Sequence, residues 1–282
     1  KDQIQENPEG FLAKNMREYK PWAFETGGST GKPLRFYNDR ISDIMESAFV
    51  WRYRTWAGYT PSDKQVIMRY KMDFPTCKES EAPGVQDNNI LYLSAFHLKD
   101  ANLNDYITKV RKFQPKTIYS FPSTLYVLAR YMLTERISPV PGLKSITTSS
   151  ETLFPHFRKT IEKAFGAKIY DWYGSNEGVI SAGECSEGRL HINSEYGLIE
   201  VVDNNGNPIQ QGEAGIVVGT SFNKFAMPFI RYSLGDRIIL SNASCSCGRG
   251  LPLIESLEGR LDDLIVTKDG RFVGRLDEAF HD

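Results

Sequence analysis

The order of strand-like and helix-like segments constrains the fold of this chain more than any other feature. Segments with one apolar face at helical spacing cover residues 39–55, 102–113, 123–134 and 154–165. Short apolar runs that are typical of strands fall between them, at residues 34–37, 66–68, 91–96, 117–119, 143–147 and 168–172. Strands that alternate with helices usually form parallel sheets. We therefore predict an α/β fold with a mixed or parallel sheet layered with helices.

Local signals set the ends of these elements. Pro122 starts a turn and Ser123 can cap the helix that follows it. Gly166 is a natural C-terminal stop for the helix at 154–165. Residues 76–89 are polar and include Pro83, so we expect a loop there.

The pattern changes after Ser175. Residues 191–240 form short alternating segments, separated by turn sequences at 203–206 and 211–213. This pattern is typical of a smaller antiparallel, barrel-like β subdomain. We therefore predict three parts, which are an α/β core at 1–178, the β subdomain at 179–258, and a last segment at 259–282 that begins a further domain, so that the chain is a piece of a longer protein.

Charge and hydropathy exclude several classes of protein. The 282 residues carry a formal net charge of −1, so there is no electrostatic case for nucleic acid or an anionic membrane. No apolar run approaches the roughly 20 residues that span a bilayer. The first twenty residues are polar and charged, unlike a signal peptide. We expect a cytoplasmic protein with no membrane insertion.

A glycine-rich run offers a place for phosphates. Backbone amides of glycines can approach an anion closely, and hydroxyls and a lysine add donors. The run is not a Walker A loop, because Thr26 and Pro33 stand where that motif needs glycine and Ser or Thr. A flexible hairpin turn is the alternative. The residues of the run are Thr26, Gly27, Gly28, Ser29, Thr30, Gly31 and Lys32.

The four cysteines are too few for a disulfide scaffold in a chain of this length. Cys185 and His191 form one close pair of ligand types, and Cys245 and Cys247 form another. Two such pairs fit a structural tetrahedral zinc, whereas a disulfide is the alternative. Cys77 has no such neighbour and is expected to be a spectator.

Five stretches in order resemble the adenylate-forming superfamily of acyl-CoA synthetases, peptide-synthetase adenylation domains and luciferases. The glycine-rich run is similar to its phosphate loop. The other four are similar to its adenine segment, its aromatic-Gly-Ser/Thr-x-Glu motif, its Tyr-x-x-Gly-Asp motif and its hinge, at residues 149–153, 171–177, 231–236 and 259–263. The sequences at residues 94–98, 119–125 and 245–249 resemble those of the phenylacetate–CoA ligase-like branch, which includes relatives associated with capsule biosynthesis.

The resemblance implies ATP and Mg²⁺ as cofactors and assigns catalytic roles to Ser175, Glu177 and Lys32. Ser175 would bond the α-phosphate, Glu177 would coordinate magnesium and Lys32 would act as a mobile cation. Asp236 would accept bonds from the ribose hydroxyls, and Arg260 would contact the ribose or α-phosphate. Beyond the phosphate loop and these two residues, the implied nucleotide-binding residues are Ser150, Glu151, Asp171, Trp172 and Tyr173. The simpler interpretations are a turn residue for Asp236, a core residue for Tyr173, a solvated loop acid for Glu177, and a surface ion pair for Arg260 and Asp262.

The same resemblance implies an acyl pocket and a hinge. The pocket residues are Phe96, His97, Ser120, Phe121 and Gly174, and Asp262 matches the hinge about which a C-terminal domain rotates. The implied reaction is activation of a carboxylic acid as an acyl-adenylate, followed by transfer to CoA. An amine acceptor in polysaccharide biosynthesis, a nucleotide-binding domain without full activity and a zinc-braced interaction module are the alternatives. A homodimer is a further assembly that the resemblance allows.

Overall fold

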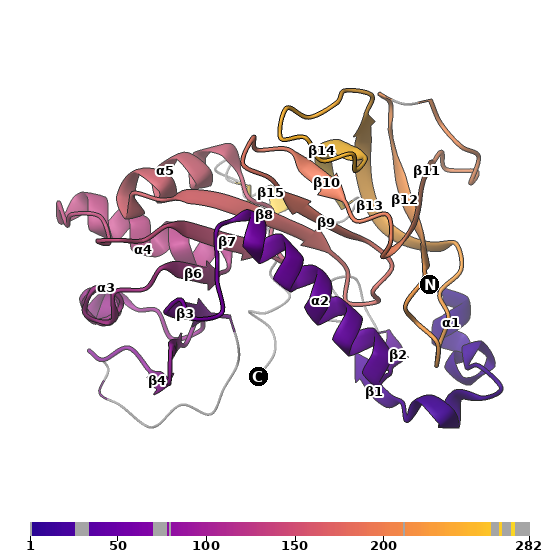
Figure 1. The fold of residues 1–282 in the computed structure, drawn as a ribbon, viewed down its shortest axis with the longest axis horizontal. Helices are drawn as coiled ribbons and strands as arrows, with labels where there is room; N and C mark the ends of the chain where they lie inside the picture. The colour runs from indigo at the N-terminus through magenta and orange to yellow at the C-terminus, as the bar shows by residue number, and fades with distance from the viewer. Residues whose placement is uncertain are drawn as a thin grey trace. The chain divides into compact units, whose positions relative to one another are not determined.

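The computed structural model describes residues 2–25, 34–69, 78, 80–210, 212–260, 265–266 and 272–273. It divides into two compact units (Figure 1). The central unit is Tyr53–Trp172, and the terminal unit joins Lys1–Arg52 to Tyr173–Asp282. Each unit is described by itself. The predicted parts at 1–178, 179–258 and 259–282 stay a prediction.

The central unit is built on a sheet in which β5, β3, β6, β7 and β8 pair in parallel and β4 adds an antiparallel edge. Figure 1 shows these strands side by side, accompanied by the connecting helices. The strands are β3 (Gln65–Met68), β4 (Gly84–Asp87), β5 (Ile90–Leu93), β6 (Thr117–Ser120), β7 (Ser145–Ser149) and β8 (Lys168–Gly174), the last reaching two residues past the unit. The helices are α3 (Leu103–Phe113), α4 (Pro122–Thr134) and α5 (Pro155–Phe165).

Apolar periodicity explains these elements. In α3 the residues Leu103, Tyr106, Ile107 and Val110 are buried, as their spacing predicts. Every residue of β3 and β7 is buried, which is typical of strands covered on both faces. Gly166 closes α5 with φ of 73°, a backbone conformation that favours glycine. The predicted α/β layering is therefore confirmed.

Three local predictions in this unit are wrong. The residue in the capping position before α4 is Phe121, with Pro122 already in the first turn, so Ser123 is not the cap. Residues 84–87, expected in a loop, form the edge strand β4 because pairing with β5 outweighs their weak strand propensity. The strand expected at 91–96 ends at Leu93.

The terminal unit begins with α1 (Asp2–Glu6) and two short 3-10 helices, η1 (Pro8–Phe11) and η2 (Met16–Tyr19). A hairpin of β1 (Trp22–Glu25) and β2 (Arg35–Asn38) follows, and then α2 (Arg40–Trp56), whose last turn belongs to the central unit. Leu34 and Phe36 are fully buried among apolar residues from later in the chain, including Val217 and Ile238 in two strands and Phe229 in the connection between these strands. The first 38 residues thus share one core with the second half of the chain.

The rest of the terminal unit is antiparallel, which confirms the predicted β region. Its strands pair in the order β11-β12-β13-β14-β10-β9. They are β9 (Ser181–Glu184), β10 (Leu190–Ile192), β11 (Gly197–Val202), β12 (Ala214–Ser221), β13 (Tyr232–Ser241) and β14 (Leu253–Arg260). A two-stranded antiparallel pair, β15 (Ile265–Val266) with β16 (Phe272–Val273), completes the described strands.

Within the described residues, no helix combines the length and apolar character needed to cross a membrane.

Candidate functional site

The phosphate-loop candidates Thr26, Gly27, Gly28, Ser29, Thr30, Gly31 and Lys32 lie outside the described residues, as do Cys77 and Asp262. The strands on either side of the loop are described. β1 and β2 pair antiparallel, and Glu25 stands opposite Arg35. Two paired strands therefore flank the glycine-rich run in the sequence.

Two of the predicted motifs meet in the terminal unit. The Tyr173 hydroxyl donates to Asp236 Oδ2 at 2.7 Å, and the Tyr232 hydroxyl donates to Glu177 Oε1 at 2.9 Å. These bonds join residues 171–177 to residues 231–236, which are about sixty positions apart in the sequence. Asp236 also stands opposite Arg260 in the β13–β14 pairing. The structure thus brings together four of the residues that the sequence assigned to nucleotide or magnesium.

A tight turn carries Ser175 and Glu177. The Gly178 amide donates to the Ser175 carbonyl oxygen at 3.0 Å, and the Val179 amide lies 3.4 Å from Ser175 Oγ. Gly178 has φ of 69°, and a Cβ there would lie 2.5 Å from Lys224 Cε. Glu177 is only 6% exposed, so its carboxylate is held by the protein rather than by solvent. Glycine is therefore required directly after the candidate magnesium ligand.

Lys224, which sequence reasoning missed, lies over this turn. Its ammonium group donates to Asn38 Oδ1, and Glu46 in turn accepts from the Tyr196 hydroxyl. Burial lowers the pKa of Lys224 to about 8, although nearby carboxylates, of which Glu46 contributes most, act to raise it. Burial also raises the pKa of Glu46. The residues next to Lys224 in the sequence do not indicate that its side chain is buried or which side chains it contacts.

A cavity of about 190 Å³ opens beside the same turn. Its lining includes Ser175, Asn176 and Gly178 of the turn, together with Tyr196 and Lys224. A small ligand in this cavity would therefore contact the turn.

In the central unit, the adenine-segment candidates follow the end of β7. Ser150 has φ of 71°, a strained conformation for a residue with a side chain. Glu151 accepts from the Ser123 amide and from the Ser123 hydroxyl, each at 2.9 Å. Asp171 Oδ1 accepts from the Thr148 hydroxyl at 2.6 Å, and Trp172 packs against Tyr53 with ring centroids 4.9 Å apart. The nucleotide roles of these residues stay predictions.

The acyl-pocket candidates of this unit lie at the ends of β5 and β6. The rings of Phe96 and Phe121 meet edge to face at 6.2 Å. His97 Nδ1 lies 2.6 Å from the Ser94 hydroxyl, which fixes the imidazole orientation. Ser120 is fully buried and donates to the Met68 carbonyl oxygen at 3.0 Å, so its hydroxyl is engaged in joining two strands. Gly174 is the last residue of β8, in the terminal unit.

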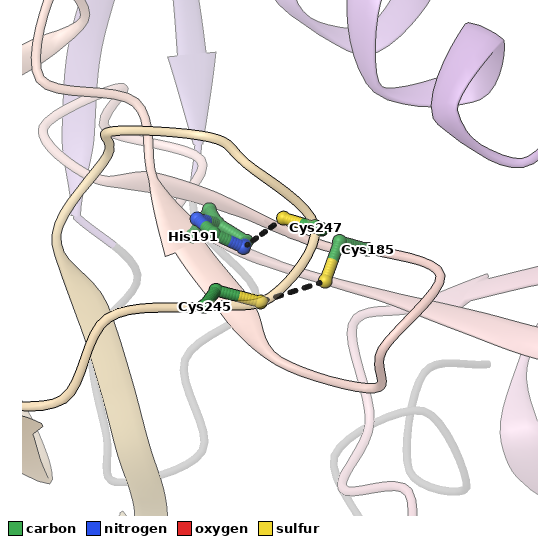
Figure 2. Close-up of side chains that lie close together, drawn as sticks. All are labelled: Cys185, His191, Cys245 and Cys247. Carbon is green, nitrogen blue, oxygen red and sulfur yellow. Dashed lines mark hydrogen bonds between the residues drawn. The ribbon is translucent and has the colours of Figure 1, made fainter.

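The four metal-ligand candidates converge in the terminal unit, as Figure 2 shows. The ligand atoms of Cys185, His191, Cys245 and Cys247 all lie within 4.8 Å of one another. Cys185 Sγ is 3.7 Å from Cys245 Sγ, and Cys247 Sγ is 3.3 Å from His191 Nε2. Cys185 and His191 are fully buried beside β9 and β10, whereas the other two come from the turn between β13 and β14.

These distances match the edges of a zinc tetrahedron. Zn–S bonds of about 2.3 Å and Zn–N bonds of about 2.0 Å separate two sulfurs by about 3.8 Å, and sulfur from nitrogen by about 3.5 Å. A disulfide needs sulfurs about 2.05 Å apart, so Cys185 and Cys245 are not bonded in this arrangement. The donor set therefore fits one zinc ion.

The electrostatics favour the metal-binding form at His191 and Cys247 but not at Cys245. Burial lowers the pKa of His191, which favours the neutral imidazole that binds metals. Burial acts to raise the pKa of the Cys247 thiol, but hydrogen bonds from Arg249 and the neighbouring cysteines lower it to about 7. The thiolate is the form that binds zinc. A backbone hydrogen bond from Cys247 acts to lower the pKa of the Cys245 thiol, but burial and the neighbouring Cys247 and Cys185 side chains raise it.

Comparison with known proteins places these features in context. No protein-family model matches the chain. It is 30% identical to Protein CapK of Staphylococcus aureus over 244 residues, which are 86% of this chain and 53% of CapK. It is 32% identical to a phenylacetate–coenzyme A ligase of Thermus thermophilus over 166 residues, which are 56% of this chain and 37% of the ligase. The chain therefore spans about half of CapK and less of the ligase.

A solved structure supports the fold. The chain resembles 2-hydroxyisobutyryl-CoA ligase, in the postadenylation state in complex with R3-HIB-AMP, with a TM-score of 0.70 and 20% identity. The similarity covers 98% of this chain and 59% of that protein.

Proposed function

From the similarity to Protein CapK and to phenylacetate–coenzyme A ligases, we propose that this chain belongs to the phenylacetate–coenzyme A ligase-like branch of the adenylate-forming superfamily. It would be part of an enzyme that activates a carboxylic acid with ATP. The observation that carries the proposal is the meeting of two motifs through the Tyr173–Asp236 and Tyr232–Glu177 hydrogen bonds. These bonds orient two carboxylates in one unit. Asp236 would bind the ribose, and Glu177 would bind magnesium. The product would be an acyl-adenylate, with transfer of the acyl group to CoA as the second step.

In the first step, a carboxylate oxygen of the acid attacks the α-phosphorus of ATP, and the bond from that phosphorus to the bridging β-phosphate oxygen breaks. Pyrophosphate leaves, and no proton is transferred. Catalysis then rests on positioning and on stabilising charge on phosphate oxygens. Ser175 holds the α-phosphate, and Glu177 is the residue that would hold magnesium. When bound, Mg²⁺ would neutralise negative charge on the phosphates and so favour the departure of pyrophosphate.

Other candidate residues would supply the remaining nucleotide contacts. Thr26, Gly27, Gly28, Ser29, Thr30, Gly31 and Lys32 would bind the β- and γ-phosphates. Tyr173 and Trp172 would lie against adenine, and Asp171, Ser150 and Glu151 would bond it. Asp236 and Arg260 would contact the ribose. Asp262 would serve as the hinge.

In the second step, the thiol sulfur of CoA attacks the acyl carbon, AMP leaves and the thiol gives up its proton. The rings of Phe96 and Phe121 favour an acid with an aryl or aliphatic side chain, which would pack against them. His97 and Gly174 complete the proposed acyl pocket. Ser120 would act there through the backbone that it anchors rather than through its hydroxyl.

Exchange of labelled pyrophosphate into ATP tests the first step. The full-length protein is assayed with a panel of aryl and aliphatic acids, with Mg²⁺ present or chelated. We expect acid- and magnesium-dependent exchange with at least one acid. ATP binding without exchange for any acid would favour a nucleotide-binding domain that lacks full activity, and no ATP binding at all would favour an interaction module.

An amine acceptor is the second candidate for the acyl transfer. Supplying the adenylated acid with CoA or with an amino sugar, and identifying the product by mass, separates thioester from amide formation. A homodimer is a further proposal, which sedimentation of the full-length protein checks.

We also propose that Cys185, His191, Cys245 and Cys247 hold a structural zinc ion. The four ligands leave no open position for a substrate, so the zinc would act as a cross-link between two turns of the β region. Metal analysis of the purified protein should give one zinc per chain.

A further inference from the structure

Arg69 is the last residue of the described segment that follows β3, and its guanidinium group bonds the end of β7. Nη1 donates to the Ser149 carbonyl oxygen at 3.1 Å and to the Ser149 hydroxyl at 2.7 Å. Nη2 donates to the Ser150 hydroxyl at 2.6 Å. Three charge-assisted bonds from one planar group fix both residues at once.

Two aromatic rings hold the guanidinium in this position. Its central carbon lies 4.5 Å from the Tyr119 ring centroid and 4.4 Å from the Phe121 ring centroid. Tyr119 lies in β6, the strand between β3 and β7, and Phe121 comes directly after that strand. Contacts at these distances are attractive and restrict the rotation of the arginine side chain. Arg69 therefore ties the carboxyl ends of three neighbouring parallel strands together.

The segment that Arg69 bonds is under backbone strain. Ser150 has φ of 71°, a conformation that L-residues with a side chain rarely adopt and keep only when their surroundings enforce it. On one side the enforcing contacts are the bonds from Arg69, and on the other they are the bonds between Glu151 and Ser123. Ligands of open α/β sheets bind at this edge, outside the carboxyl ends of the strands.

We propose that Arg69 is a positioning residue for nucleotide binding, which holds Ser149–Glu151 in the strained conformation that receives the adenine of ATP. The inference rests on the proposed function, which assigns this segment to adenine. Arg69 lies outside all five motifs. Its bonds to Ser149 and Ser150 link the strained segment to the end of β3.

The test compares Arg69→Met with Arg54→Met in the full-length protein. Arg54 is the matched control, because its guanidinium carbon lies 4.8 Å from the same Tyr119 ring, but its contacts do not include Ser149 or Ser150. ATP affinity is measured by calorimetry, KM for ATP and kcat by pyrophosphate exchange, and folding by thermal denaturation. We expect Arg69→Met to raise Kd and KM for ATP about tenfold, with kcat changed less than threefold and KM for the acid unchanged. Arg54→Met should leave the Kd within twofold.

Two further variants separate positioning from charge and from direct contact. Arg69→Lys keeps the charge but loses the planar fork, so we expect its Kd to resemble that of Arg69→Met. Ser150→Ala should weaken ATP binding, and adding it to Arg69→Met should weaken binding no further, because the two residues share one interaction.

Each result has a defined meaning. Full affinity in Arg69→Lys, or effects of Arg69→Met and Ser150→Ala that multiply, would overturn the inference. So would equal affinities for Arg69→Met and Arg54→Met. If Arg69→Met does not fold, Ser150→Ala with unchanged affinity overturns it in the same way. Failure of the unmodified protein to bind ATP would instead reject the proposed function.

Discussion

At the scale of single residues, Lys224 stands out because a buried ammonium group lies among four carboxylates. Its side chain is only 8% exposed, and its ammonium also lies 5.4 Å from the Phe36 ring centroid. Burial outweighs the attraction of Glu46, Asp39, Glu177 and Asp43, and the pKa falls to about 8. The folded protein therefore loses this proton about two pH units earlier than the unfolded chain, in which lysine has a pKa of about 10.4.

This difference makes stability depend on pH. Between about pH 8 and pH 10 the unfolded chain binds more protons than the folded protein at this position, so the free energy of unfolding rises with pH, by at most about 1.4 kcal/mol per unit. Urea unfolding at pH 7.5, 8.5 and 9.5 should show that Lys224→Met removes this rise. Lys14→Met, at an exposed position, should leave the rise in place. Equal slopes for Lys224→Met and the unmodified protein would contradict the account.

At the scale of elements, the turn between β8 and β9 depends on Gly178. The backbone there needs positive φ, and the Lys224 side chain fills the space that a Cβ would take. Gly206 also has positive φ, at 82°, but no atom lies within 4 Å of the Cβ position. An added Cβ would therefore cause backbone strain at both glycines, but steric overlap only at Gly178.

Alanine substitutions exploit this contrast. Gly206→Ala should cost about 1 kcal/mol of stability from backbone strain alone. Gly178→Ala should cost about 1–3 kcal/mol more, from overpacking against Lys224. It should also raise the Mg²⁺ concentration needed for pyrophosphate exchange, since Glu177 would move. Denaturant unfolding and magnesium titration give the two values, and equal costs at both positions would count against the packing described here.

The metal cluster is the second element-scale feature, because it joins the β9–β10 turn to the β13–β14 turn. Cys245→Ser should lose zinc and lower Tm by about 5–10 °C, as expected for a lost structural metal in a chain of this size. Ser246→Ala, at the exposed position between the two cysteines, should keep both zinc and Tm. A Cys245→Ser variant that retained one zinc per chain would show that the ligand set is different.

Elements that depend on a local sequence pattern could be predicted, whereas contacts between residues far apart in the sequence could not. Apolar spacing placed α3 and α5 within about one residue, because one buried face decides a helix. The cysteine–histidine cluster was predictable because each pair is close in sequence and chemically rare. Arg69 and Lys224 were missed because their partners Ser149 and Asn38 lie 80 and 186 positions away. The edge strand β4 was missed because its partner strand, rather than its own residues, makes it a strand.

At the scale of the whole molecule, the proposed nucleotide residues are divided between two compact units. Ser150, Glu151, Asp171 and Trp172 belong to the central unit, whereas Tyr173, Ser175, Glu177 and Asp236 belong to the terminal unit. Within each unit, hydrogen bonds hold the candidates in place before any ligand is bound. The chain spans 53% of CapK, so the complete reaction is a property to test on the full-length protein.

The central claim is that the acid is activated by forming a bond from its carboxylate oxygen to the α-phosphorus of ATP. The most direct measurement uses an acid labelled with ¹⁸O in the carboxylate, together with ATP, Mg²⁺, CoA and the full-length protein. Attack of the thiol on the acyl carbon leaves the bridging oxygen on phosphorus, so mass spectrometry should find one ¹⁸O in AMP and none in pyrophosphate. Label in inorganic phosphate with formation of ADP would show an acyl-phosphate route and contradict the account.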